Sequence, residues 1–375
     1  MKLNIENFKC FSKVEVPIKY LTILAGSNGS GKSSVIQSLL LLRRAIENCT
    51  NLKEGQYNLN NINNSNVELN DVYCLGLGNS GNLVDSSEEI NIKLFEEKQE
   101  LYIKFDTNKG FELFITPKFL KKSYENNPLL YKEFYYLNAE RIGPRISQGL
   151  KSYDFPNVGF QGELTAQIIG DIDKNFDFKV DENRILADEK YEKGVRFHQR
   201  INSWLDYILG GVTIDSHQDD KTHTARIEVE NSFTKGKPIF PTNTGFGISY
   251  CLPIVVTCLL AKKDRFVIIE NPEAHLHPSA QSKMGYFLGV MANSGLRIII
   301  ETHSDHIING VQIAVVKKKI NHDKVIINYF EKDTDQLKIN PISTNDKGEL
   351  SEWPKGFFDQ TQIDFSELIK LRKNV

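Results

Sequence analysis

GSNGSGKS at residues 26–33 decides the fold, because it matches the phosphate-binding loop pattern G-x-x-x-x-G-K-[ST] at every fixed position. The apolar run LTILA at residues 21–25 predicts a buried strand before it. Apolar side chains over residues 35–46 predict a helix that packs against a sheet. A strand, a loop and a helix in this order form the context that the pattern requires, so we expect the chain to bind a nucleoside triphosphate.

The residue types in the loop indicate how it would hold ATP and Mg²⁺. Its glycines let the backbone curl so that successive N–H groups point at phosphate oxygens. Lys32 is expected to reach the terminal phosphates, and Ser33 to offer its hydroxyl to Mg²⁺. The residues that we expect at the nucleotide are Gly26, Asn28, Gly29, Gly31, Lys32, Ser33 and Ser34.

Composition narrows the class of protein. The 375 residues suggest about two domains by length alone, and the net charge of -2 implies no overall attraction to nucleic acid or to an acidic membrane. The five cysteines form no C-x-x-C pair, which argues against zinc ribbons and redox motifs. The N-terminus has no apolar core of signal-peptide length, and residues 252–260 are too few to span a bilayer, so we expect a cytoplasmic protein with no membrane segment.

Alternating apolar and polar residues predict strands around the loop. Residues 2–11 and 14–18 are expected to pair ahead of it. A second alternating set, at 90–95, 101–105 and 111–115, predicts an antiparallel β-subdomain inserted after the first helix. We expect its hairpin turn at Asn108, Lys109 and Gly110.

The segment FYYL at 134–137 predicts a further strand, which leads into NAERIGPR at 138–145. Arg141 and Arg145 suit a phosphate or a carboxylate, or equally a surface turn held by ion pairs. Residues 163–209 are interpreted as mainly helical.

Three motifs follow downstream. The glycines of TNTGFGIS, at 242–249, precede an apolar helix whose N-terminus would face an anion. The buried strand at 266–269 ends in Glu270, and the one at 296–300 ends in Glu301, Thr302 and His303. Ligands bind at the carboxyl ends of such strands, and a carboxylate beside a phosphate loop orients Mg²⁺.

The order of these motifs resembles the ABC-type ATPases of the SMC, RecF and OLD (overcoming lysogenization defect) group. The details NAERIGPR, GFGISYCLPI, ENPEAHLHP, ETHSDHI and WPKGFFD look like a bacterial predicted-ATPase family in that group, linked to anti-phage defence. The resemblance spans nearly the full chain. It implies an α/β P-loop NTPase head over residues 1–340, with a mixed sheet, an inserted antiparallel β-subdomain at 55–135 and a mainly helical signature region at 150–250. Residues 341–375 would form a C-terminal extension.

The resemblance also implies residue roles. Glu270 would be the acidic residue of the second nucleotide motif and hold Mg²⁺ with Ser33, and His303 would be the switch histidine that senses the γ-phosphate. The signature position would be occupied by Gly245, Gly247 and Ser249. In such ATPases the signature of one subunit completes the nucleotide site of the other, which implies a homodimer that ATP closes and hydrolysis opens.

One departure from the group matters. The group usually carries Asp-Glu-Pro-Glu, whereas this chain has Glu270, Asn271, Pro272 and Glu273. Asparagine can orient water but cannot accept its proton. Either Glu273 or Glu301 supplies the carboxylate, or hydrolysis is slow and ATP acts mostly as a clamp; we favour Glu273 over Glu301.

The biological role implied by the resemblance is regulation of a separate effector, often a nuclease, in anti-phage defence. One alternative is a RecF-like repair ATPase that binds DNA. Another is an OLD-like nuclease, because Asp333 and Asp335 resemble the acidic pair of a Toprim domain. Their position between strand candidates at 325–330 and 336–339 favours a polar hairpin turn.

Overall fold

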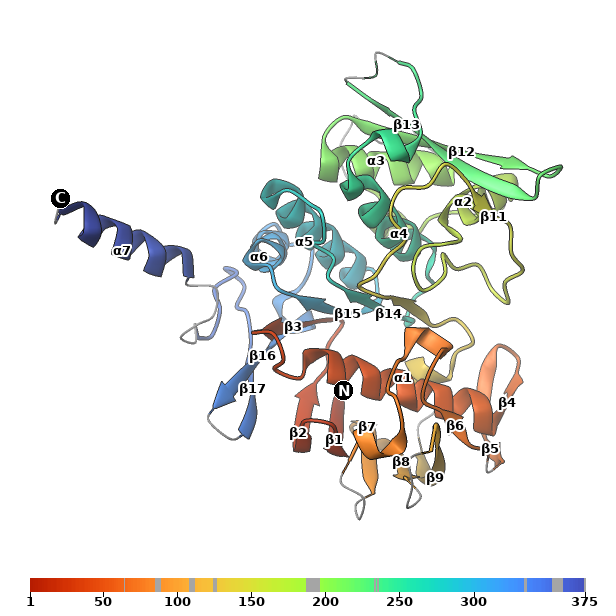
Figure 1. Cartoon of the computed structure of the whole chain (residues 1–375), viewed down its shortest axis with the longest axis vertical. Helices are drawn as coiled ribbons and strands as arrows, with labels where there is room; N and C mark the ends of the chain where they lie inside the picture. Colours follow the sequence, from red (N-terminus) through yellow and green to blue (C-terminus); the bar gives the residue numbers. More distant parts are fainter. Residues whose placement is uncertain are drawn as a thin grey trace.

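The structure is a computed structural model, which describes residues 1–63, 65–84, 89–107, 112–123, 127–186, 196–232, 234, 236–333, 336–352 and 360–373. Two lobes flank a central sheet (Figure 1). One lobe carries an antiparallel sheet and the first helix, and the other carries the remaining packed helices and a small third sheet.

The central sheet has six strands. Their spatial order is β10 (Tyr135–Leu137), β14 (Phe266–Glu270), β15 (Arg297–Thr302), β3 (Leu21–Gly26), β16 (Val325–Asp333) and β17 (Gln336–Ile342). All neighbours pair in parallel except β16 and β17, so the sheet is mixed as expected. Strands buried on both faces are apolar throughout, which explains why the runs at 266–269 and 296–300 were recognisable. The carboxyl ends of β3, β14 and β15 therefore meet at one edge.

The antiparallel sheet differs from the predicted separate insert. Its order is β2 (Phe11–Pro17), β1 (Lys2–Phe8), β7 (Ile90–Glu96), β8 (Gln99–Asp106), β9 (Phe114–Ser123) and β6 (Val67–Glu68). Strand β1 pairs with β7, so strands β6 to β9 of the predicted insert share one sheet with the N-terminal hairpin. The physical reason is a shared core, in which Leu3 and Ile5 are buried together with Ile92 and Leu94. The predicted turn at Asn108, Lys109 and Gly110 lies outside the described residues.

Helix α1 (Lys32–Cys49) follows the phosphate loop and is buried along most of its length. Its apolar side chains belong to the same hydrophobic cluster as the antiparallel sheet. Strands β4 (Thr50–Lys53) and β5 (Gln56–Ile62) form a short hairpin after it. The short 3-10 helices are η1 (Val72–Cys74), η2 (Ser80–Asn82), η3 (Pro128–Leu130), η4 (Glu182–Arg184), η5 (Pro241–Asn243) and η6 (His322–Lys324).

The region at 150–250 corrects a second expectation, because it is not mainly helical. Besides α2 (Thr165–Lys174) and α3 (Phe197–Leu209), it contains the paired strands β12 (Val212–Asp219) and β13 (Thr224–Asn231). Strand β11 (Gln148–Gly149) adds to their edge. The alternation at Val212 and Ile214, and at Ala225, Ile227 and Val229, buries one face of this hairpin in the core shared with α2 and α3.

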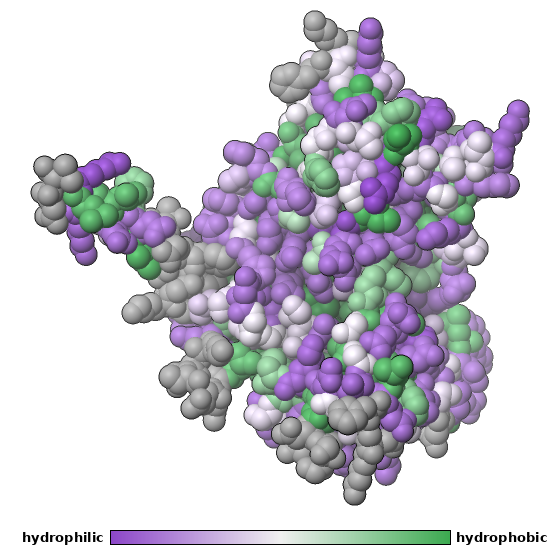
Figure 2. All heavy atoms as spheres, viewed as in Figure 1, coloured by the Kyte–Doolittle hydropathy of each residue, from purple (hydrophilic) through white to green (hydrophobic). Residues whose placement is uncertain are grey.

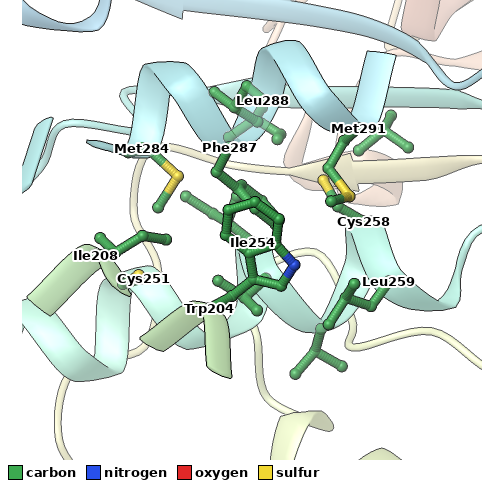
Figure 3. Packing of buried hydrophobic residues seen from close by; sticks show 14 of the residues in the cluster. Trp204, Ile208, Cys251, Ile254, Cys258, Leu259, Met284, Phe287, Leu288 and Met291 are labelled. Carbon is green, nitrogen blue, oxygen red and sulfur yellow. The ribbon is translucent and has the colours of Figure 1, made fainter. Parts of the chain in front are cut away.

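Helices α4 (Phe246–Leu260), α5 (Pro278–Asn293) and α6 (Asp305–Val316) lie on the face of the central sheet opposite α1 (Figure 1). Trp204 of α3 joins them, and its ring lies 4.9 Å from that of Phe287 in α5 (Figure 3). The indole is 1% exposed, and its N–H donates to the carbonyl oxygen of Arg184 at 2.8 Å. This core attaches the helical lobe to the central sheet.

Helix α7 (Gln360–Lys373) projects from the body and ends the chain (Figure 1). Its exposed apolar residues, visible in green in Figure 2, are Ile363, Phe365, Leu368, Ile369 and Leu371. The WPKGFFD motif at 353–359 lies outside the described residues. Among the residues that the structure does describe, no helix is both long and apolar enough to cross a membrane.

A pH-sensitive contact joins α2 to the start of α3. The Nδ1 atom of His198 lies 2.7 Å from Oδ2 of Asp173, whose other oxygen accepts the His198 backbone N–H, and the side-chain hydrogen bond raises the pKa of His198. The contact between His198 and Asp173 therefore stabilises the fold fully below about pH 6.5, the pKa of histidine in the unfolded chain. This stabilisation disappears as pH rises through the raised pKa of His198 in the folded protein.

We predict that Asp173→Asn lowers the free energy of unfolding by about 0.5–1 kcal/mol at pH 6 and much less at pH 9. Asparagine keeps an oxygen for the backbone N–H, so the substitution isolates the charge. Urea unfolding of both proteins at the two pH values measures the difference, and an equal loss at both would contradict it.

Candidate nucleotide site

The phosphate loop connects the end of β3 to the start of α1 and requires glycine for its shape. Gly26 has a φ of 144°, and a Cβ there would lie 2.4 Å from the carbonyl oxygen of Phe330 on β16. Gly31 has a φ of 91°, and a Cβ there would lie 2.8 Å from the ring of Phe11. Residues 27–29 between them are exposed, so their backbone is open to a ligand.

Lys32 lies folded across this loop. Its Nζ donates to the carbonyl oxygens of Gly26 at 3.0 Å and Ser27 at 2.7 Å, and the residue is 3% exposed. Burial lowers its pKa, while the charges of Glu301 and Glu273 oppose that effect. A phosphate in the loop would offer the ammonium group charged acceptors in place of two carbonyls.

The side chain of Glu301 contacts Ser33, the loop residue that we expect to bind Mg²⁺. Ser33 donates its hydroxyl to Oε1 of Glu301 at 3.0 Å, while Oε2 is buried without a partner in the described part of the chain. Burial, then the nearby charge of Glu270, raises the pKa of Glu301 to about 7. Glu301 is thus a carboxylate in contact with Ser33.

Glu270 lies at the end of β14 beside a tyrosine that the sequence did not single out. The Tyr136 hydroxyl donates to Oε1 of Glu270 at 2.9 Å and accepts from the Asn138 amide at 3.0 Å. Burial raises the pKa of Glu270, and these hydrogen bonds partly oppose it. In the sequence, the hydroxyl of Tyr136 within the apolar strand FYYL was the feature that could have indicated a polar contact there.

Arg141 has a role that neither sequence interpretation included. It is 3% exposed and donates to the carbonyl oxygens of Glu270 at 2.7 Å and Asn271 at 2.6 Å. Burial lowers its pKa to about 10. Arg141 therefore fixes the backbone of the acidic motif, whereas Arg145 is exposed.

The contacts of Glu273 account for both of its carboxylate oxygens. One accepts the Thr302 hydroxyl at 2.7 Å, and the other accepts the backbone N–H of His303 at 2.7 Å. Asn271, at φ 46°, donates its backbone N–H to the carbonyl oxygen of Glu301, and its side-chain Oδ1 is buried without a partner in the described residues. These contacts favour Glu301 over the sequence preference, Glu273, as the carboxylate that acts on water.

His303 lies between β15 and α6 with an exposed side chain. Partial desolvation of the ring by its neighbours, then the charge of Lys32, lowers its pKa, so the neutral imidazole is favoured. The next residue, Ser304, caps α6 and donates its hydroxyl to Gln281 of α5 at 2.6 Å. The histidine is therefore held close to the loop by both Glu273 and α5.

The expected signature residues lie at the first turn of α4. Gly245 is the exposed cap, and a Cβ on Gly247 would lie 3.0 Å from the carbonyl oxygen of His275. Phe246 is 51% exposed and stacks on the His275 ring at 5.2 Å, and Ser249 is half-buried. These contacts are with the loop after the acidic motif, and the helix N-terminus is open to solvent.

The donors at this edge suit Mg²⁺. Among the described residues no three His, Cys, Asp or Glu side chains form a metal cluster. Mg²⁺ in nucleotide sites usually takes one or two carboxylates and completes its shell with phosphate and water. The Ser33 hydroxyl and the carboxylate of Glu270 fit that pattern, while Glu301 beside them keeps one oxygen without a partner in the described residues. A divalent cation there would offset the repulsion between Glu270 and Glu301.

Two family models match parts of the chain. A family model described as "AAA domain, putative AbiEii toxin, Type IV TA system" matches residues 21–309. A second, described as "Protein of unknown function (DUF3696)", matches residues 320–368. No curated protein matches the chain.

Two solved structures share its fold. The "SmcHead bound to the C-winged helix domain of ScpA" is 12% identical, with a TM-score of 0.53, over 91% of this chain and 97% of that one. The Smc head domain with an extended coiled coil, bound to the C-terminal domain of ScpA derived from Pyrococcus furiosus, is 11% identical, with a TM-score of 0.50, over 91% and 96%. At this identity the likeness shows the fold alone.

The predicted fold class is thereby confirmed as a P-loop NTPase head of the SMC type with mixed and antiparallel sheets. The family model covers well over half of the chain. The chain therefore belongs to the family described as "AAA domain, putative AbiEii toxin, Type IV TA system".

Proposed function

We propose that this protein is a cytoplasmic ATPase whose ATP-driven dimerisation switches a separate partner protein. The proposal rests on one observation: among the described residues, those around the phosphate loop and the N-terminus of α4 share no hydrogen bond or ring contact within one chain. Lys32, Ser33, Glu301 and His303 surround one strand edge, whereas the N-terminus of α4 at Gly245 opens to solvent and contacts other residues. A second copy supplies that helix end to the nucleotide.

Binding of ATP would use the loop backbone and Lys32, and Ser33 and Glu270 would hold Mg²⁺. Mg²⁺ supplies charge neutralisation for the phosphates. Tyr136 and Arg141 keep Glu270 in place through its side chain and its backbone. His303, neutral and exposed, can donate to a γ-phosphate oxygen.

Hydrolysis needs a group that takes a proton from water. Glu301, with a pKa near 7 and a free oxygen, can do so, and the amide of Asn271 can orient the water. Because an amide replaces the usual carboxylate at Asn271, we expect slow turnover. ATP then holds two heads together for long periods, which suits a switch.

The helix N-terminus of α4 explains why the partner copy recognises ATP. Unpaired N–H groups and the helix dipole attract anions there. Since Gly245 has open space around it, a second molecule can approach closely. Dimerisation is thus linked to occupancy of the loop by a triphosphate.

Mixing two inactive variants tests this arrangement. Lys32→Ala disables the loop, and Gly245→Glu places a negative charge at the open helix end, where the fold tolerates it. If the signature acts across the dimer, a 1:1 mixture can form heterodimers with one intact site of two, so up to about half of wild-type ATPase activity returns.

The matched control mixes Lys32→Ala with Glu301→Gln. Both changes lie in the half-site of the loop, so no combination of the two chains contains an intact site. Recovery in the first mixture alone supports the proposal. Absence of recovery in both would show that α4 does not act on the partner's nucleotide.

The family description, with its toxin–antitoxin system, supports a role in bacterial defence. We propose a separate effector protein, by analogy a nuclease, as the regulated partner, with DNA as a further candidate ligand. A nuclease within this chain is less favoured, because β16 and β17 form a hairpin that pairs Asp333 with Gln336. Asp335 of the suspected acidic pair lies outside the described residues.

A further inference from the structure

A cavity of about 250 Å³ lies between the two lobes, and none of its lining residues belongs to the phosphate loop. Its walls come from the end of α1, from residues 72–73, from 134–136 around β10, from residues 154–160 and from α4. The position between these segments makes it a candidate for a ligand that both lobes contact.

Six of the thirteen residues that line the cavity are aromatic. The ring of Tyr73 lies 4.9 Å from that of Phe160 and 5.6 Å from that of Phe134. The ring of Tyr136 lies 6.2 Å from that of Phe160, and Phe155 lines the same space. The faces of such rings carry partial negative charge and attract cations.

The charged groups at the cavity are anionic. Glu47 is already neutralised, because it accepts from Nε of Arg43 at 2.8 Å. Asp154 is exposed at the rim and forms no ion pair with any residue that the structure describes. A phosphate-bearing ligand would be repelled, while a positive ligand would find an unpaired carboxylate.

An unused hydroxyl also faces this space. Thr257 of α4 lines the cavity and is 1% exposed, and its Oγ1 has no hydrogen-bond partner in the described part of the chain. A buried polar atom without a partner is costly, so a ligand with a donor would stabilise it.

Backbone strain holds one of the rings in place. Tyr73 has a φ of 56°, which is unfavourable by about 1 kcal/mol or more for a non-glycine residue. Its hydroxyl donates to Glu47, and Nε of Arg43 donates to it. The strained turn therefore presents the ring to the cavity in one position.

We propose that this cavity binds a small organic cation of the alkylammonium class, free in solution. The aromatic walls would surround the alkyl groups, Asp154 would neutralise the charge, and the Thr257 hydroxyl would receive a ligand polar group. Tyr136 both lines the cavity and donates to Glu270, so occupancy would alter the nucleotide site. That coupling rests on the proposed ATPase function, whereas the binding does not.

The test uses nucleotide-free protein and two probe pairs. Choline is compared with 3,3-dimethyl-1-butanol, its neutral counterpart, and putrescine with 1,4-butanediol, by calorimetry. We expect at least one cation to bind about 2- to 30-fold more tightly than its neutral counterpart, as a cation–π contribution of about 0.5–2 kcal/mol implies. Asp154→Asn should reduce that preference, and its exposed position leaves folding intact.

The proposal would be overturned if, in both pairs, the cation and its neutral counterpart bound equally. It would also be overturned if neither cation bound at a concentration on the order of 10 mM. A second variant, Tyr136→Phe, separates the coupling from the binding. The cation should change the ATPase rate of the wild type and leave that of Tyr136→Phe unchanged. If the cation binds and the wild-type rate does not respond, the site stands and the coupling is wrong.

Discussion

Lys32→Ala is expected to reduce ATP hydrolysis by about 10²- to 10³-fold, because one preorganised cation at the terminal phosphates is removed. In the structure the ammonium group donates to the carbonyl oxygens of Gly26 and Ser27, and the charges of Glu301 and Glu273 act on it. ATP should no longer raise the thermal midpoint of the variant, although it raises that of the wild type. Phosphate release and thermal unfolding with and without ATP measure both effects.

Lys13→Ala is the matched control. Lys13 also lies near the N-terminus, is exposed and pairs with Glu6, but it has no contact with the loop. Its removal should leave ATP binding and turnover unchanged. Equal turnover in Lys32→Ala and the wild type would show that the loop is not the site of hydrolysis.

Glu301→Gln is expected to slow turnover by about 10²- to 10⁴-fold while ATP binding is retained. Glutamine can still accept the Ser33 hydroxyl, but its amide cannot take a proton from water. Glu273→Gln should slow turnover less than about tenfold, because Glu273 holds Thr302 and His303 and glutamine can keep most of those hydrogen bonds. Single-turnover hydrolysis and ATP titrations of both variants separate chemistry from binding.

The reverse order of effects would restore Glu273 as the group that acts on water. If neither substitution slows hydrolysis, both assignments are wrong, and a group other than Glu273 or Glu301 assists the hydrolysis of ATP.

The sequence was sufficient for the parts of the site that local pattern determines. The loop glycines, Lys32 and Ser33 occur at fixed spacing because the backbone itself binds phosphate. Buried parallel strands are apolar throughout, so the acidic ends at Glu270 and Glu301 could be located as well.

What the sequence could not show depends on contacts between distant residues. Glu301 and Glu273 both occur at or just after the end of a buried strand, and only the structure shows that Ser33 contacts the first and the backbone of His303 the second. Arg141 looks like a ligand for phosphate until its carbonyl partners are known.

The two fold corrections have the same cause. Short alternating segments specify strands but not their partners, so the pairing of β1 with β7 could not be predicted. The hairpin at 212–231 was not predicted from the sequence, because its buried face depends on α2 and α3, which lie elsewhere in the chain.

The central claim is that ATP joins two heads, and the mass in solution tests it most directly. Light scattering would be recorded with no nucleotide, with ADP and with ATP and Mg²⁺, on the wild type, Lys32→Ala and Glu301→Gln. We expect ATP to shift Glu301→Gln fully, and the wild type partly, to twice the monomer mass, while Lys32→Ala stays unchanged in all conditions. A mass that never changes in Glu301→Gln, although ATP is bound, would contradict the account.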